Sequence, residues 1–222
     1  DQGNPVFADK IGYVQHVDMK GLQEFASKNA IRIVLTAVPG VFVAPGRPLA
    51  HLSKDEEALP EEGLSEIVKA FEIGKNRVYD DDPRFALVAL SEIASRALSP
   101  AVNDPGTAIR IFGSFIRLFE VFSRPPTEDE PHSVQFDRIS VPDISATEML
   151  EDAFRATERD GAGIIEVQIR LQKALQAIAS MNCERLSDAA RKESRSALQR
   201  AENALTSNSD IQQLHAAAEW SR

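Results

Sequence analysis

Cysteine is almost missing from this chain of 222 residues, in which Cys183 is the only one. A single cysteine cannot form a disulfide within the chain, and this excludes the disulfide-built scaffolds of small secreted proteins. It also excludes metal sites made of several cysteine thiolates. The four histidines are scattered and lack the short spacings of a zinc site: His16, His51, His132 and His215. We therefore expect neither a metal site nor a cofactor.

The chain has fewer basic than acidic residues: 25 Lys and Arg and 34 Asp and Glu, which gives a net charge of −9. Nucleic-acid binding depends on clustered Lys and Arg that contact phosphates, so we expect no nucleic-acid partner.

Long hydrophobic runs are missing as well. The longest apolar tract, residues 31–43, contains Arg32, Pro39 and Gly40 and is shorter than the roughly 18 residues of a membrane-spanning helix. We expect this stretch of chain to be soluble.

Common catalytic motifs are absent too. The sequence contains no Gly-x-Ser-x-Gly, no Walker A motif and no Gly-x-Gly-x-x-Gly, so it lacks the signatures of serine hydrolases, phosphate-loop proteins and dinucleotide-binding domains. The triple acid Asp80-Asp81-Asp82 offers the oxygen ligands that divalent cations prefer. Consecutive side chains rarely converge on one ion, however, and negative charge is favourable at the start of a helix. We interpret these three residues as a helix start.

The N-terminal part of the chain is rich in β-branched residues. Two such runs, 11–17 and 31–38, have the length of strands, and the segment between them has apolar residues at helical spacing. The Pro45-Gly46 pair that follows is typical of a tight turn and predicts a hairpin. These patterns predict a small strand–helix–strand–hairpin unit over residues 8–54.

Helical spacing dominates after Pro60. One predicted helix ends near Gly74 and carries four apolar residues on one face: Leu64, Ile67, Val68 and Phe71. Asp82-Pro83 and Asp104-Pro105 each combine an N-cap acceptor with a proline at the first helical position. They predict helices over residues 83–98 and 105–123.

These two helices carry apolar residues on more than one side, so we expect a buried antiparallel pair. The second is rich in phenylalanine, and its apolar surface exceeds what the first helix alone can cover: Phe112, Phe115, Phe119 and Phe122. Either the C-terminal helices or a second copy of the chain must cover the surplus. Because symmetric oligomers are common, we expect a homo-oligomer.

The C-terminal part begins after a proline-rich and acidic linker, residues 125–131. A short strand is expected over 134–141 and is predicted to return to the first sheet. Ser145 and Glu148 then form a capping box, and further helices follow up to residue 220. The predicted fold is therefore α+β, with the small N-terminal unit packed on a predominantly helical bundle. We predict three regions within one continuous soluble domain: the unit over 8–54, a buried helical hairpin over 60–124 and a C-terminal helical bundle over 134–220.

The corner between the two proline-capped helices concentrates polar side chains. Free amides at the start of the second helix favour an anion, and Arg84 or Arg110 could supply the counter-charge. The candidate polar or ligand site contains six residues: Asp82, Arg84, Ser99, Asn103, Asp104 and Thr107. The alternative interpretation is a structural corner held by its own hydrogen bonds.

Part of the sequence resembles a known family. The relevant motifs are Phe71-Glu72-Ile73-Gly74, then Asp82-Pro83-Arg84-Phe85-Ala86-Leu87, then Arg96-Ala97-Leu98-Ser99-Pro100-Ala101-Val102-Asn103-Asp104-Pro105. Together with the opening strand and the Pro45-Gly46 turn, they resemble DUF2254, a bacterial family of predicted membrane proteins with a domain of unknown function. The similarity extends over residues 10–125.

The resemblance implies that transmembrane helices precede this segment and that it forms a soluble C-terminal region. It further implies the inner membrane of a bacterium, with this domain in the cytoplasm. The sequence begins with Asp1 and has no signal-peptide pattern, so we expect a piece of a longer protein. The predicted role is assembly, regulation or ligand sensing, with a small-molecule ligand as one partner. Two alternatives remain: an enzyme with its site at the Asp82, Asn103 and Asp104 corner, or a protein-binding adaptor.

Overall fold

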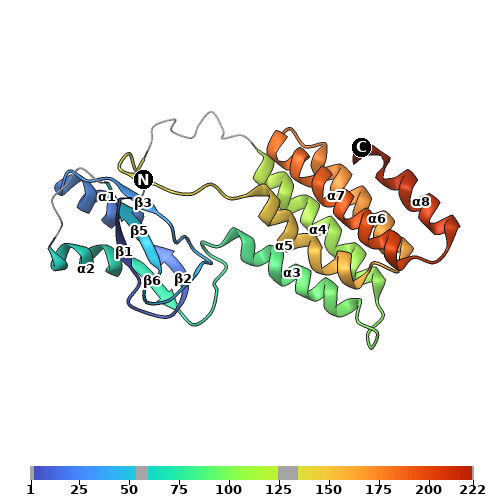
Figure 1. Cartoon of the computed structure of the whole chain (residues 1–222), viewed down its shortest axis with the longest axis horizontal. Helices are drawn as coiled ribbons and strands as arrows, with labels where there is room; N and C mark the ends of the chain where they lie inside the picture. The colour runs from blue at the N-terminus through green and yellow to red at the C-terminus, as the bar shows by residue number, and fades with distance from the viewer. Residues whose placement is uncertain (1–2, 54–59, 125–134, 222) are drawn as a thin grey trace. The chain divides into compact units, whose positions relative to one another are not determined.

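The computed structural model describes residues 3–53, 60–124 and 135–221. Its contacts divide the chain into two compact units (Figure 1). The first contains Asp1–Phe85 and Glu128–Asp143, and the second contains Ala86–Thr127 and Ile144–Arg222. The predicted linker over 125–131 lies outside the described residues. The α+β prediction is confirmed, since strands build the first unit and helices build the second.

The first unit contains a four-stranded sheet. Its strands follow the order β1 (Asn4–Phe7), β5 (Pro48–Leu52), β3 (Ile33–Leu35) and β7 (Ile139–Ser140). The first three are antiparallel to their neighbours, while β7 lies parallel to β3 with Ile33 beside Ile139. The short strand predicted before the C-terminal helices therefore does return to the first sheet.

The second sheet of this unit has the order β4 (Phe42–Val43), β2 (Gly12–Val17) and β6 (Phe71–Gly74). Two helices, α1 (Met19–Lys28) and α2 (Glu61–Lys69), accompany the sheets. They contribute Leu22 and Ile67 to the core of the unit, where both side chains are buried.

Two local predictions in this unit are wrong. The turn at Pro45-Gly46 forms, with the Arg47 amide donating to the Ala44 carbonyl at 3.0 Å, but β4 and β5 join different sheets and make no hairpin. The reason is that β1 and β3 already occupy both edges of β5. The helix expected to reach Gly74 ends at Lys69, because Phe71 pairs with Val17 of β2 and is buried there.

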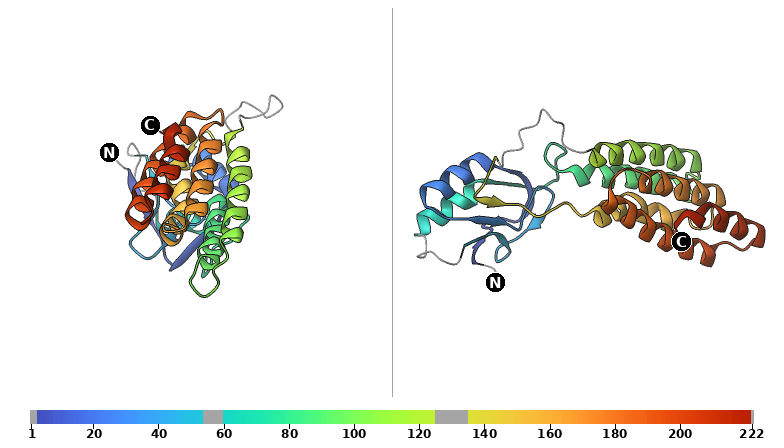
Figure 2. Two further views of the ribbon diagram at one scale, coloured as in Figure 1. Left: turned by 90° about the vertical axis from the view of Figure 1, so that its right-hand side faces the viewer. Right: turned by 90° about the horizontal axis from the view of Figure 1, so that it is seen from above.

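The second unit is a bundle of long helices (Figures 1 and 2). They are α3 (Pro83–Ala97), α4 (Pro105–Ser123), α5 (Ala146–Asp160), α6 (Ile165–Ala179), α7 (Glu184–Ala204) and α8 (Asn208–Ala218), followed by a 3-10 turn at Glu219–Ser221. The first three residues of α3 belong to the other unit. Helix α6 packs against both α4 and α7, and α5 packs against α7.

The predicted N-caps are present. Asp82 accepts from the amides of Arg84 and Phe85, both at 3.1 Å. Asp104 accepts from the Thr107 amide at 3.1 Å, and Ser145 accepts from the Glu148 amide at 3.3 Å. Each cap satisfies amides that the first turn of a helix leaves without partners.

The phenylalanine-rich helix is buried within the chain itself. Phe112, Phe115 and Phe119 are all inaccessible to solvent or nearly so. The ring of Phe154 on α5 lies 5.1 Å from that of Phe115 and 5.8 Å from that of Phe112. The C-terminal helices therefore cover this surface. Helix α3 is buried along one face only, because its Ile93 is exposed.

Candidate functional site

The six residues of the predicted corner lie at two separate places. Asp82 and Arg84 are at the start of α3, whereas the other four follow its end: Ser99, Asn103, Asp104 and Thr107. The helix has 15 residues, and at about 1.5 Å per residue its two ends are roughly 22 Å apart. The structure does not bring the six side chains together.

At the start of α3, Asp82 is buried and its hydrogen-bonding capacity is used. Arg77 donates to it twice, at 2.6 Å from Nε and 2.9 Å from Nη2, and the two capping amides complete its partners. Gly40 approaches so closely that a Cβ atom there would lie 2.3 Å from Asp82 Oδ2, and its φ is +90°. Asp82 is thus a structural anchor of the first unit.

At the end of α3, the polar side chains satisfy one another. Thr107 Oγ1 donates to Asp104 Oδ2 at 2.5 Å, and Arg110 donates to Thr107 Oγ1 at 2.5 Å. The Thr107 hydroxyl and amide bonds lower the pKa of the Asp104 carboxyl. Ser99 Oγ donates to the Arg96 carbonyl at 2.7 Å, and Asn103 adopts a positive φ of 48°. These contacts describe a capped helix corner.

A hollow lies instead between α3 and α5. Two adjoining cavities of about 560 and 380 Å³ share Glu92 and Ser95, and we call them together the α3–α5 groove. Volumes of this size are typical of ligand sites. The lining from α3 and the turn after it is Val88, Ser91, Glu92, Ser95, Arg96, Leu98, Ser99 and Pro100; that from α5 is Glu151, Asp152, Arg155, Ala156, Arg159 and Asp160. Ser99 is the one predicted site residue in it.

Serine hydroxyls follow the α3 side of the groove. Ser91, Ser95 and Ser99 are spaced four residues apart, which places them on one side of the helix end. Ser95 donates to Asp160 Oδ2. Ser91 is only 3% exposed, and its hydroxyl has no hydrogen-bond partner among the described residues. A buried hydroxyl without a partner is costly, so Ser91 is a buried polar group of the groove whose bonding capacity is unused by the described residues.

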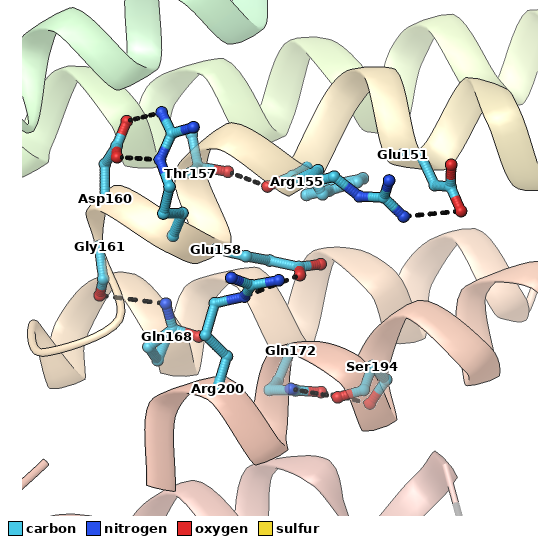
Figure 3. Close-up of polar contacts among 12 residues, drawn as sticks. Glu151, Arg155, Thr157, Glu158, Asp160, Gly161, Gln168, Gln172, Ser194 and Arg200 are labelled. Atoms are coloured by element: carbon cyan, nitrogen blue, oxygen red, sulfur yellow. Dashed lines mark hydrogen bonds and ion pairs between the residues drawn. The ribbon is translucent and has the colours of Figure 1, made fainter. Parts of the chain in front are cut away.

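Charged groups of both signs line the groove from α5 (Figure 3). Arg155 Nη2 lies 2.8 Å from Glu151 Oε1, and Arg159 donates to both Asp160 oxygens at 2.7 and 3.0 Å. The bonds from Arg159 and from Ser95 lower the pKa of Asp160. On the α3 side, Glu92 and Arg96 are exposed.

A second polar cluster is buried inside the bundle, where α5, α6 and α7 meet. Its members are at most 5% exposed: Thr157, Glu158, Gln168, Gln172, Glu193 and Ser194. Gln172 donates to the Ser194 carbonyl at 3.1 Å and accepts from the Ser194 hydroxyl at 2.5 Å, and Gln168 donates to the Gly161 carbonyl at 3.0 Å (Figure 3). These bonds tie α6 to α7 and to the end of α5.

The two glutamates of this cluster, unlike its glutamines, have carboxyl oxygens without hydrogen-bond donors. Both oxygens of Glu158 and one of Glu193 have no hydrogen-bond donor in the part of the chain that the structure describes. Arg200 Nε is 3.9 Å from Glu158 Oε2. Burial and the neighbouring Glu193 carboxyl raise the pKa of Glu158 to about 9.

Sequence analysis missed this cluster, because Glu158 and Glu193 stand among other charged residues and look like parts of a solvated helix face. One signal was available. Glu158 follows the apolar Leu150 and Phe154 at intervals of four residues, and Glu193 lies between Ala190 and Ala197, so both occupy the apolar stripes of their helices. Among the described residues, no group of three His, Cys, Asp or Glu side chains could hold a metal ion.

Residues 1–177 match the family described as "Predicted membrane protein (DUF2254)". The chain therefore belongs to this family, and the family resemblance of its motifs is confirmed. It is also similar to uncharacterized proteins of Mycobacterium tuberculosis and Mycobacterium bovis, with 34% identity over 110 residues. That match covers 48% of this chain and 21% of each relative, so the chain spans about a fifth of the relatives' length.

No solved structure matches the chain. Among the helices that the structure describes, none combines the length and apolar character needed to cross a membrane.

The Gln172–Ser194 pair predicts non-additive losses of stability. Ser194→Ala leaves a buried Gln172 oxygen without its donor and should lower the free energy of unfolding by about 2 kcal/mol. Because the two side chains share this bond, the double variant Ser194→Ala with Gln172→Met should lose at least about 1 kcal/mol less than the sum of the two single losses. Urea unfolding followed by circular dichroism measures all three. Ser196→Ala, at an exposed position of α7, is the control, and additive losses would contradict the pairing.

Proposed function

We propose that this chain is a domain outside the membrane of a longer inner-membrane protein, and that it senses a small polar ligand in the α3–α5 groove. Membership of a family of predicted membrane proteins supports the first part. The length of the mycobacterial relatives, of which the match covers 21%, leaves ample sequence for membrane segments. The unpartnered hydroxyl of buried Ser91 is the observation that carries the second part.

The groove favours a ligand that carries both charges. The guanidinium group of Arg96 suits a carboxylate, while the carboxylate of Glu92 suits an ammonium group. A hydroxyl such as that of Ser91 can both donate and accept a hydrogen bond. Amino acids combine these charges at a size that the groove can hold, and we propose this class of ligand.

The ligand proposal predicts selective binding. In isothermal titration of the chain with the standard amino acids, at least one should bind, whereas succinate and putrescine, which carry one sign of charge each, should bind more weakly. Ser91→Ala should weaken the affinity about tenfold by removing one hydrogen bond. This substitution leaves no buried partner unsatisfied, so it should not lower the melting temperature.

Arg96→Ala should weaken binding as well, while Ser196→Ala, outside the groove, should not. Equal affinity of the parent chain and the Ser91→Ala and Arg96→Ala variants would contradict the site. Equal binding of succinate and of an amino acid would contradict the proposed class of ligand.

We further propose that this domain lies in the cytoplasm, as the family resemblance implies. Alkaline phosphatase fused to the end of this domain in the full-length protein should then be inactive in a bacterial host, because its disulfides form only in an oxidising compartment. The matched β-galactosidase fusion should be active. The opposite pair of activities would place the domain on the other side.

Self-assembly is a second candidate function, supported by exposed apolar residues on α4. Leu118 is 38% exposed and Val121, one turn later, is 60% exposed. Phe115 is fully buried within one chain, so it cannot serve as an interface residue.

If α4 joins two copies, sedimentation velocity of the chain should show a dimer, and Val121→Glu should convert it to a monomer because a desolvated carboxylate is costly at an interface. Helical content should stay unchanged, since Val121 contributes nothing to the core. A parent chain that stays monomeric from micromolar to near-millimolar concentration would contradict assembly by this domain.

A further inference from the structure

Glu158 and Glu193 bring two carboxyl groups together in the interior of the helical bundle. Glu158 comes from α5 and is 1% exposed, and Glu193 comes from the adjacent α7 and is 5% exposed. Where α5 and α7 pack together, the Glu193 carboxyl group is close enough to help raise the pKa of Glu158. When both are ionised they have only acceptors, so neither can donate a hydrogen bond to the other. Three of their four oxygens have no donor among the described residues.

Nearby cations offset the charge of the pair only in part. Arg200 Nε stays 3.9 Å from Glu158 Oε2, and its side chain is 43% exposed to water. Arg155, the other cation that acts on Glu158, is engaged by Glu151 at 2.8 Å. Figure 3 shows Arg200 reaching Glu158 from α7 while Arg155 extends toward Glu151.

Helix α6, which packs against α7 and α5, contributes no buried charge to the cluster. The residues of α6 in this cluster are the amides Gln168 and Gln172, and Gln172 is engaged by Ser194. The charged residues of α6 are exposed: Glu166, Arg170 and Lys173. Two further arginines of α7, Arg191 and Arg195, donate to the carbonyls of Trp220 and Ser221. Among the described residues, Arg200 and Arg155 are therefore the cations that act on Glu158.

Electrostatics favours one proton on this pair. Two ionised carboxylates in a buried site repel each other and lose their hydration, whereas a single proton converts the contact into a charge-assisted O–H···O⁻ bond.

We propose that Glu158 and Glu193 form a proton-binding site, which holds one shared proton between α5 and α7 at neutral pH and loosens these helices when the proton leaves at alkaline pH. The site lies apart from the groove lining, and the proposal does not depend on ligand binding there. It would make the bundle sensitive to alkaline pH.

The sign of the effect follows from proton linkage. The ordinary pKa of the glutamate side chain is 4.5, and that of Glu158 in the folded chain is raised to about 9. Between these values the folded chain binds one proton more than the unfolded chain. Its stability is therefore greatest below the lower value and falls as the pH rises toward the higher one, by up to about tenfold in the folding equilibrium constant per pH unit.

The test compares the pH dependence of unfolding in the whole chain and two variants. At constant ionic strength, the urea midpoint of the parent chain should fall between about pH 6 and pH 9. Glu158→Gln keeps a hydrogen-bond donor for Glu193 without a titrating proton, so its midpoint should change much less over this range. Glu166→Gln makes the same chemical change at an exposed position of α6 and should keep the parent slope. Equal slopes for the parent and Glu158→Gln would overturn the proposal.

Infrared spectroscopy provides a readout that does not require the variant to fold. The parent chain should show the carbonyl stretch of a protonated carboxyl group near neutral pH, and this band should disappear at alkaline pH. Absence of the band near neutral pH would overturn the proposal.

A bound cation would be the competing explanation for the pair. Calcium chloride added at about pH 8 should leave the urea midpoint of the parent chain no higher than the same ionic strength of tetramethylammonium chloride does. A calcium-specific rise that Glu158→Gln abolishes would show a cation site in place of a proton site, and would overturn the proposal.

Discussion

The ring of Phe154 packs against Phe112 and Phe115, and this contact sets the orientation of α5 in the bundle. All three side chains are buried, and aromatic burial of this kind provides several kcal/mol per residue, about 3 to 5 when truncated to alanine. Once Phe154 points toward α4, the helical repeat fixes the direction of all the remaining side chains of α5. Glu158, one turn later, faces the interior near α7, while Arg155 and Arg159 line the α3–α5 groove.

Helix α5 therefore joins two chemically different places in one rigid element. On one side lies a groove with hydroxyls and charges of both signs, and on the other a buried pair of carboxyl groups. Both depart from ordinary packing in the same respect, because each leaves a buried polar atom without a partner in the part of the chain that the structure describes. Such atoms are uncommon in folded proteins, and they mark the positions where a ligand or a proton would supply the missing bond.

In the first unit, by contrast, the buried polar groups around Asp82 satisfy one another. Its buried ion pair between Arg77 and Asp82 uses the whole capacity of the carboxylate, and the close approach of Gly40 leaves no space beside it. A polar cluster that is fully satisfied stabilises a fold and has little left to offer a ligand. The triple acid that looks like a cation site in the sequence therefore includes a structural anchor, Asp82.

Some features were decided by the sequence alone. The helix starts at Asp82, Asp104 and Ser145 could be predicted because capping depends on residues within one turn of each other. The succession of helices in the second unit and the apolar stripe of α4 could also be predicted, because hydrophobic periodicity is a local property of the sequence. Family membership also followed from contiguous motifs between Phe71 and Pro105.

Only the tertiary structure decided which distant residues meet. The strands β4 and β5 are neighbours in sequence but belong to different sheets. Phe71 fits the apolar spacing of the preceding helix, yet it lies in a strand because it pairs with β2. The six residues of the predicted corner were separated by the length of α3, which makes neighbours in a motif distant in space. Glu158 and Glu193 meet because α5 and α7 pack side by side. Contact between two helices buries residues of both at once. The residue pattern of one helix therefore does not identify the helix that packs against it.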